Sequence, residues 1–237
     1  LKGNNYFSVF YQNKNSSLLS TKRFASLTVL PDYADVSTQL DGIGIHYAKL
    51  DYNLNPRKGF SIVADGSVGT KIISKNSAIK ESLYDGIKLN SNLYNSNSVL
   101  DFYFPVAKRS VIKLSSKNGF TINESLFDNE LVRIGGLFTL RGFDEESIFT
   151  TFYSIGTFEF RYILEQNSYL YLFFDQSYYE KDNIKGYISD RPYGFGTGMS
   201  FDTKAGIFSI SYALGQQFDN PILFRSAKIH FGFINFF

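Results

Sequence analysis

FSISYALG, residues 208–215, alternates bulky apolar side chains with small or polar ones along its whole length. Successive residues of a β-strand point to opposite faces, so this stretch predicts a strand with one apolar and one partly polar face. The same two-residue period runs through 60–72, 157–162 and 193–201. No amphipathic helix longer than about two turns is recognisable. The sequence therefore predicts an all-β fold.

The connections between strands indicate how the strands are arranged. We predict eleven strands, at 3–13, 21–30, 42–54, 60–74, 91–104, 111–118, 150–163, 169–180, 193–201, 207–216 and 226–237. The short turns lie at 55–59, 105–110, 164–168 and 202–206. The longer, polar loops lie near 75–90, 119–149, 181–192 and 217–225. Short connections on one side and long ones on the other are typical of a transmembrane antiparallel β-barrel, in which lipid-facing and lumen-facing residues alternate.

A soluble β-sandwich or lipocalin-like barrel also alternates, and it is the main alternative. Such a fold would have an apolar hidden face and a charged face in water. Here the non-apolar face is rich in Gly, Ser and Thr, and the apolar face is rich in Phe, Tyr and Ile. The chain also ends on Phe237 inside a predicted strand, whereas the termini of soluble domains tend to be polar. These features favour the membrane barrel.

The composition argues against several classes of protein. The chain has no cysteine and two histidines, His46 and His230, so we expect no metal site. Its formal net charge of +2 argues against nucleic acid as a partner. No apolar run approaches the roughly 18 residues of a membrane helix. Neither histidine has a nucleophile and a base at a motif spacing, so we expect no catalytic site and no cofactor.

One stretch outside the strand pattern is more specific. GGLFTLRGF, residues 135–143, resembles the (V/L)RGF signature of the BamA/TamA superfamily of outer-membrane assembly proteins. Further segments are similar to that family in the same order: 47–69, TFEFRYIL at 157–164, YLYLFFDQSYY at 169–179, 193–215 and the last strand. The resemblance covers roughly residues 42–237, and it is closest to TamA-like members associated with Bacteroidetes.

The resemblance implies a barrel larger than this chain. Family members have a sixteen-stranded barrel preceded by periplasmic POTRA domains, and this chain has neither the POTRA domains nor the length for sixteen strands. Bacterial single-chain barrels have even strand numbers, and our count of eleven is odd. We therefore expect residues 1–237 to be a single outer-membrane β-barrel domain, the C-terminal part of a longer barrel and incomplete on its N-terminal side.

The resemblance also implies a role for the signature loop. In the family this loop folds back into the lumen and its arginine contacts acids of the inner wall; the matching residues are Arg141, Glu159 and Asp175. The alternation independently places both acids on the lumen face, and a planar guanidinium can bind two carboxylates. Arg161 shares that face with Glu159 and is a competing partner. The glycines of the motif would allow tight turns, and its apolar side chains would pack against the wall. The motif comprises Gly135, Gly136, Leu140, Arg141, Gly142 and Phe143.

Membership of this family would imply a non-enzymatic function in the bacterial outer membrane. Such a protein would help to insert or export β-barrel proteins by pairing a client strand with the edge of a weakly sealed seam. Its closing half would be 226–237, with Gly232 as a candidate weak point and Phe236 and Phe237 at the end. Expected partners are outer-membrane lipids, client outer-membrane proteins, and periplasmic proteins or lipoproteins. Two alternatives remain open: the barrel part of a patatin-like lipase fusion, and a passive pore.

Overall fold

A computed structural model describes residues 5–18 and 28–235 of the chain. Nearly all of its regular structure is β-strand; the exceptions are the short 3-10 helices η1 (Glu81–Tyr84), η2 (Asp128–Glu130) and η3 (Phe224–Ser226). The strands are β1 (Tyr6–Ser16), β2 (Asp35–Leu50), β3 (Gly59–Ser74), β4 (Asn90–Ala107), β5 (Ser110–Ile122), β6 (Val132–Ile134), β7 (Ile148–Thr150), β8 (Phe152–Ile163), β9 (Tyr169–Asn183), β10 (Gly186–Asp190), β11 (Tyr193–Thr203), β12 (Gly206–Gln216) and β13 (Lys228–Ile234). The predicted all-β class is confirmed.

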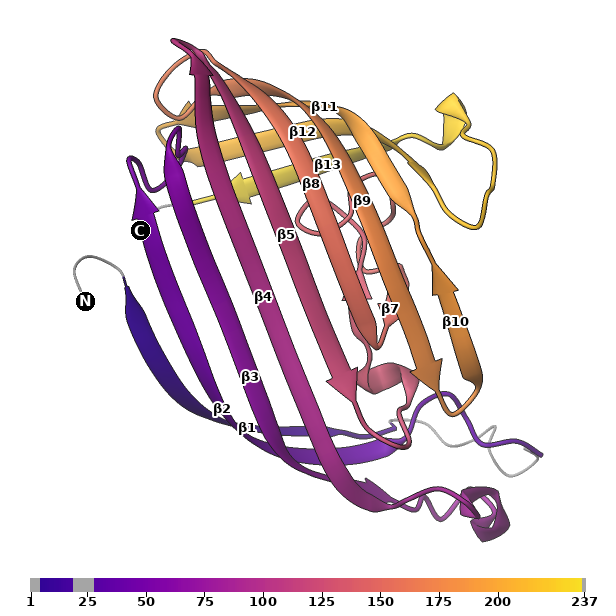
Figure 1. The fold of residues 1–237 in the computed structure, drawn as a ribbon. Coiled ribbons are helices and arrows are strands. Elements are labelled where there is room, and N and C mark those ends of the chain that lie inside the picture. The colour runs from indigo at the N-terminus through magenta and orange to yellow at the C-terminus, as the bar shows by residue number, and fades with distance from the viewer. Residues whose placement is uncertain (1–4, 19–27, 236–237) are drawn as a thin grey trace.

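Eleven of these strands form one antiparallel sheet, which curls around an interior segment containing the small sheet β6–β7 (Figure 1). Ten strands form the wall in the order β1-β2-β3-β4-β5-β8-β9-β11-β12-β13, and β10 pairs with the C-terminal end of β9. No pairing joins β1 to β13 within the described residues, so the wall is open between these two edges. The described residues therefore form one curled sheet and not the two packed sheets of a β-sandwich.

Short and long connections alternate along the wall, as predicted. The short ones are 51–58, 108–109, 164–168 and 204–205. The long ones are 17–34, 75–89, 123–151, 184–192 and 217–227, and the third and fourth of these contain β6, β7 and β10. Because the ten wall strands are antiparallel, β1 begins and β13 ends on the side of the short turns.

The predicted strand set is wrong near the N-terminal side. Of the predicted strand at 21–30, residues 21–27 lie outside the described residues and 28–30 are not in a strand. β2 begins at Asp35 rather than at 42, because Val36 and Leu40 point inward here and are buried, while the residues between them are polar. At this end of β2 the apolar side chains thus point to the interior instead of the outer face. The two-residue pattern used for the prediction therefore does not reveal the start of the strand. The described wall has ten strands, so the odd count no longer supports an incomplete barrel, which stays an expectation from the resemblance.

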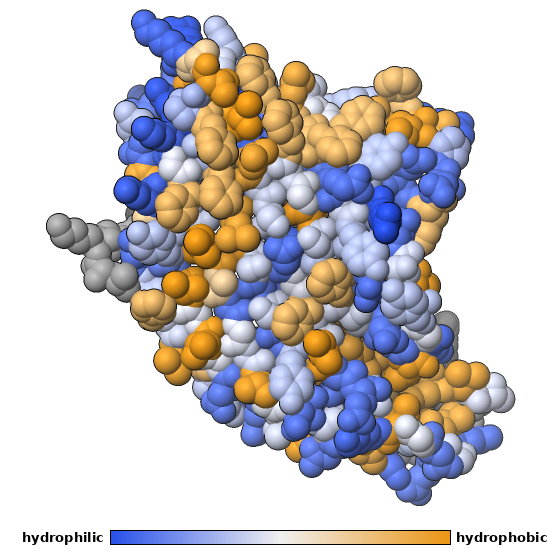
Figure 2. All heavy atoms as spheres, in the orientation of Figure 1, coloured by the Kyte–Doolittle hydropathy of each residue, from blue (hydrophilic) through white to orange (hydrophobic). Residues whose placement is uncertain are grey.

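The outer face of the wall carries many exposed apolar side chains. On β8 and β9, Phe158, Leu172 and Phe174 are 46, 60 and 43% exposed, while the residues between them point inward. Figure 2 shows hydrophobic residues gathered over the wall, most densely toward the upper ends of the strands in that view. Contiguous exposed apolar patches commonly mark surfaces that contact another molecule or a membrane. None of the helices in residues 5–18 and 28–235 is long and apolar enough to cross a membrane.

A polar cluster interrupts this apolar face on β4, β5 and β8. Ser154 Oγ donates a hydrogen bond to Asn118 Oδ1 at 2.7 Å, and Asn118 Nδ2 donates to Ser98 Oγ at 3.3 Å. These side chains therefore satisfy one another, which lowers the cost of placing them in apolar surroundings. The alternation did not predict this cluster.

The interior contains several small apolar clusters rather than one continuous core. One lies at the end of the wall that carries the long loops, where 28–34 and 75–89 meet β2 and β3; it comprises Leu30, Ala34, Val36, Ile73, Ile79, Tyr84 and Phe127. A second surrounds the signature loop and comprises Ile134, Leu140, Ile148, Ile155 and Tyr179. The second cluster is the one that positions the candidate site.

Candidate functional site

The signature loop, residues 135–147, connects β6 to β7 and lies inside the curl of the sheet (Figure 1). Leu140 is fully buried against Ile155 and Tyr179 of the inner wall, and Phe143 packs against the same cluster. The loop also closes on itself: the Gly136 amide donates to the Leu140 carbonyl at 3.0 Å, and Thr139 Oγ1 donates to the Gly135 carbonyl at 2.8 Å. These contacts fix the backbone on both sides of Arg141.

Arg141 contacts both predicted carboxylates. Its Nε and Nη2 donate to the two oxygens of Asp175 at 2.8 and 2.7 Å, which is the paired geometry that a guanidinium offers a carboxylate. Nη1 donates to Glu159 Oε2 at 2.7 Å. The backbone amide of Arg141 donates to Asp175 as well, at 3.2 Å. The loop is thereby attached to β8 and β9 through one residue.

Arg161 takes part in the same cluster, so Glu159 is shared. Arg161 Nε donates to Glu159 Oε1 at 2.8 Å, and its Nη1 donates to the side-chain oxygen of Asn55 at 3.2 Å. Two guanidinium groups thus face two carboxylates, and their formal charges cancel. The sequence left open whether Glu159 binds Arg141 or Arg161; in the structure it binds both. A buried charge is tolerated when it is paired in this way.

The arginine cluster is shielded from water by aromatic rings. Arg141, Glu159 and Asp175 are 7, 6 and 0% exposed. The Arg141 guanidinium lies 3.6 Å from the centroid of the Phe173 ring, close enough for a strong cation–π contact. Burial alone disfavours the charged guanidinium, but the hydrogen bonds and charge of Asp175, together with Glu159, outweigh it and raise the pKa of Arg141. Arg141 therefore stays charged throughout the accessible pH range.

Two glycines allow the loop backbone to reach the wall. Gly142 has a φ of +94°, and a Cβ there would collide with the backbone of β12 at Leu214. On β11, a Cβ at Gly194 would overlap the carbonyl oxygen of Arg141. Gly194 therefore leaves the space in which the loop lies.

The acids after the motif are also in contact with cations. Asp144 lies 2.7 Å from Lys228 of β13, and Glu146 lies 3.8 Å from Arg133 of β6. The side chains of both acids remain mostly exposed, so these ion pairs contribute little to stability. The first of these pairs nevertheless brings Asp144 of the loop next to β13.

The closing strand contacts the loop through residues that sequence reasoning did not connect with it. His230 of β13 is buried, and its Nε2 accepts a hydrogen bond from the Gly142 amide at 3.2 Å. A Cβ at Gly232 would collide with Leu137 of the loop, so this glycine lies directly against the loop. Phe236 and Phe237, the other predicted seam residues, lie outside the described residues.

A second buried ion pair was missed. Lys71 of β3 is fully buried, and its Nζ lies 2.6 Å from Glu130 Oε2 and 2.5 Å from the Ser125 carbonyl oxygen. The alternation placed Lys71 on the inner face, but nothing in the sequence pairs it with a residue of the long β5–β8 connection. This ion pair attaches the start of that connection to β3, as Arg141 attaches its middle to β8 and β9.

The described residues contain no group of three or more His, Cys, Asp or Glu side chains that could hold a metal ion. No protein-family model and no curated protein matches the chain. The arginine cluster, the open edges and the apolar outer face are therefore the features from which a function is argued.

Proposed function

We propose that this chain is the barrel of an outer-membrane assembly factor similar to the BamA/TamA family, which pairs client strands at the gap between β1 and β13. The observation that carries the proposal is the signature loop held inside the curled sheet by Arg141, Glu159 and Asp175. The mechanism is non-enzymatic and needs no cofactor, since strand pairing is driven by backbone hydrogen bonds and apolar contact.

The outer face supports a location in lipid. A transmembrane strand needs about 9–11 tilted residues, and β4, β8 and β9 have 18, 12 and 15. The alternation of exposed apolar and buried polar side chains on β8 and β9 is the arrangement that a bilayer outside and a polar lumen inside require. In this proposal the long loops lie on the outer side of the membrane and the short turns lie in the periplasm.

The two edges of the wall support a role in strand exchange. β1 leaves Phe7 and Val9 70 and 86% exposed, and neither β1 nor the described part of β13 has a second strand partner. An unpaired edge offers backbone donors and acceptors to an incoming strand.

The arginine cluster would keep the wall rigid next to this gap. Through Arg141 the loop is attached to β8 and β9, and through the Gly142 amide it is attached to His230 on β13. We therefore propose that the loop holds β13 at a fixed position relative to the rest of the wall. The unpaired edge of β13 stays available for pairing with a client strand.

Reconstitution tests this function. The full chain would be inserted into liposomes, and folding of an unfolded eight-stranded client barrel into the same liposomes would be followed by its heat-modifiable migration on gels. The unsubstituted chain should accelerate client folding over empty liposomes, Arg141→Ala should abolish most of that acceleration, and Arg133→Ala should retain it. Arg133 is the matched control because it lies in the same connection and its side chain is 40% exposed. Equal client folding with and without the chain would refute the proposal.

A passive pore is the second candidate, because part of the interior next to β1–β5 is an unfilled cavity of about 690 Å³ whose lining includes polar and charged side chains. Single-channel recording separates the two functions. A large, steady conductance that Arg141→Ala leaves unchanged supports a pore, whereas a small, fluctuating conductance supports the assembly function.

A further inference from the structure

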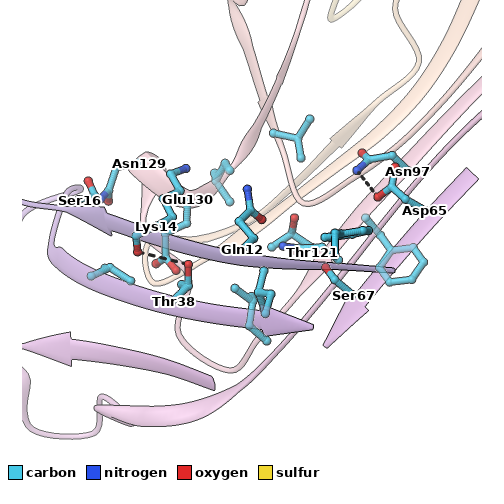
Figure 3. A pocket seen from close by; sticks show the side chains of 18 of the residues that line it. Gln12, Lys14, Ser16, Thr38, Asp65, Ser67, Asn97, Thr121, Asn129 and Glu130 are labelled. Carbon is cyan, nitrogen blue, oxygen red and sulfur yellow. Dashed lines mark hydrogen bonds between the residues drawn. The ribbon is translucent and has the colours of Figure 1, made fainter. Parts of the chain in front are cut away.

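The cavity beside β1–β5 has the chemistry of a binding site. Its lining combines residues of five wall strands, β1 to β5, with residues of the β5–β8 connection, and Figure 3 shows side chains of this lining converging on the space between them. Its volume of about 690 Å³ falls within the range of ligand pockets, roughly 300–1,000 Å³. The signature loop does not line it, so the arginine cluster does not account for it.

Two buried acceptor oxygens at this cavity lack a donor. Glu130 has a side chain that is 8% exposed; its Oε2 is bound by Lys71 and by the Phe127 amide, but within the described residues its Oε1 has no hydrogen-bond partner. The Oδ1 atom of Asn95 on β4 is also without one. Buried polar atoms are seldom left unpaired in folded proteins, so both oxygens point to a ligand, or ordered water, that donates hydrogen bonds.

The remaining lining groups favour a ligand without net charge. The charged side chains of the lining are Lys14, Asp65 and Glu130, and Glu130 is already neutralised by Lys71. Lys14 and Asp65 then balance, so the cavity has no excess charge of either sign. The other polar groups are hydroxyls and amides, including Gln12 and Asn97, which both donate and accept hydrogen bonds.

We propose that this cavity binds a neutral polyhydroxylated solute of oligosaccharide size. Each sugar hydroxyl can donate to an orphan oxygen such as Glu130 Oε1 and accept from a neighbouring amide. Phe10 also lines the cavity and provides apolar surface for the C–H face of a sugar ring. This site shares β1 with the proposed gap, but it uses neither the signature loop nor the edge of β13.

The chain contains no tryptophan, so Phe10→Trp creates a single fluorescent reporter in the lining. The full chain, folded in lauryldimethylamine oxide rather than a sugar detergent, would be titrated with maltotriose, sodium gluconate and glucosamine. We expect a saturable emission change with maltotriose and weaker responses to the anionic and cationic sugars. Calorimetric titration of the unsubstituted chain with maltotriose gives the same affinity without the reporter.

Asn95→Leu tests the geometry, because it removes an orphan oxygen. We expect it to weaken maltotriose binding by about tenfold. Asn92→Leu is the matched control, since it makes the same change on the outer face of β4 and should leave the affinity unchanged. Absence of saturable maltotriose binding in both measurements, equal affinity in Asn95→Leu, or tighter binding of gluconate or glucosamine would overturn the proposal.

Discussion

The two halves of the interior are built in different ways. Beside β8–β13 the signature loop occupies much of the space and leaves a cavity of about 460 Å³, and the charge of Arg141 is paired atom by atom with Glu159 and Asp175. Beside β1–β5 the wall borders a larger cavity of about 690 Å³, in which two acceptor oxygens have no partner. The difference indicates that the first half maintains the shape of the wall through paired charges, whereas the second, more open half has unpaired acceptors that a solute can bind. Substitutions should therefore affect stability in the first half and binding in the second.

The largest loss of stability is expected for Arg141→Ala. This change leaves Glu159 and Asp175 buried with half of their hydrogen bonds, and breaking a buried ion pair costs about 3–5 kcal/mol. Urea unfolding in liposomes, followed by heat-modifiable migration, measures the change. In the open half Asn95→Leu should shift the free energy of unfolding by less than about 0.5 kcal/mol, since its Oδ1 atom has no partner. A comparable loss in both variants would remove the distinction between the halves.

Lys71→Met should have the next largest effect. It leaves Glu130 without its cation, but Oε2 keeps the hydrogen bond from the Phe127 amide, so we expect a loss of about 2–3 kcal/mol. The double variant Lys71→Met, Glu130→Gln removes both charges and should recover part of this loss. The same unfolding experiment measures both variants. A double variant less stable than Lys71→Met alone would show that the ion pair itself is not what anchors the connection.

Gly194→Ala tests whether the loop needs close contact with β11. The added methyl group overlaps the carbonyl oxygen of Arg141 and should cost about 1–3 kcal/mol. Gly156→Ala on β8 is the matched control, because the nearest atom to its added Cβ is 3.9 Å away. Equal stability of the two variants, measured by urea unfolding, would mean that the loop does not pack against β11 as described.

Thr157→Val should have the smallest effect. Its hydroxyl donates to Asp175 Oδ1 at 2.8 Å, and valine keeps the shape but not the donor, so we expect a loss of about 1 kcal/mol. Combined with Arg141→Ala, the same change should cost a different amount than it does alone, because both groups bind one carboxylate. Strict additivity in a double-mutant cycle would contradict a shared site.

The wall could be predicted from the sequence wherever its outer face is apolar. The strands around Phe158, Leu172 and Ile210 follow the two-residue period, and the structure has them near the predicted positions. The period fails at the start of β2, where Val36 and Leu40 turn their apolar side chains inward. It also fails for β10, a short strand whose Tyr187 and Ile188 are both exposed, so no buried face marks it.

The candidate site was predictable to the extent that its partners lie on patterned strands. Glu159 and Asp175 alternate with apolar residues, and their inward direction follows from that alternation. Glu130 lies in an irregular connection, and its contact with Lys71 depends on the course of that connection through the interior. No local sequence pattern predicts that course. The contact of His230 with the Gly142 amide spans 88 residues and is equally invisible in the sequence.

The central claim is that the apolar face of the wall lies in lipid and the polar face lines an aqueous interior. The chain has no cysteine, so single spin labels at Leu172→Cys on the outer face and Gln12→Cys in the cavity are unambiguous. In liposomes, collisions with oxygen and with a water-soluble nickel complex measure the surroundings of each label by electron paramagnetic resonance. The account predicts that the label at 172 favours oxygen and the label at 12 favours nickel. Free access of the nickel complex to the label at 172 would contradict it.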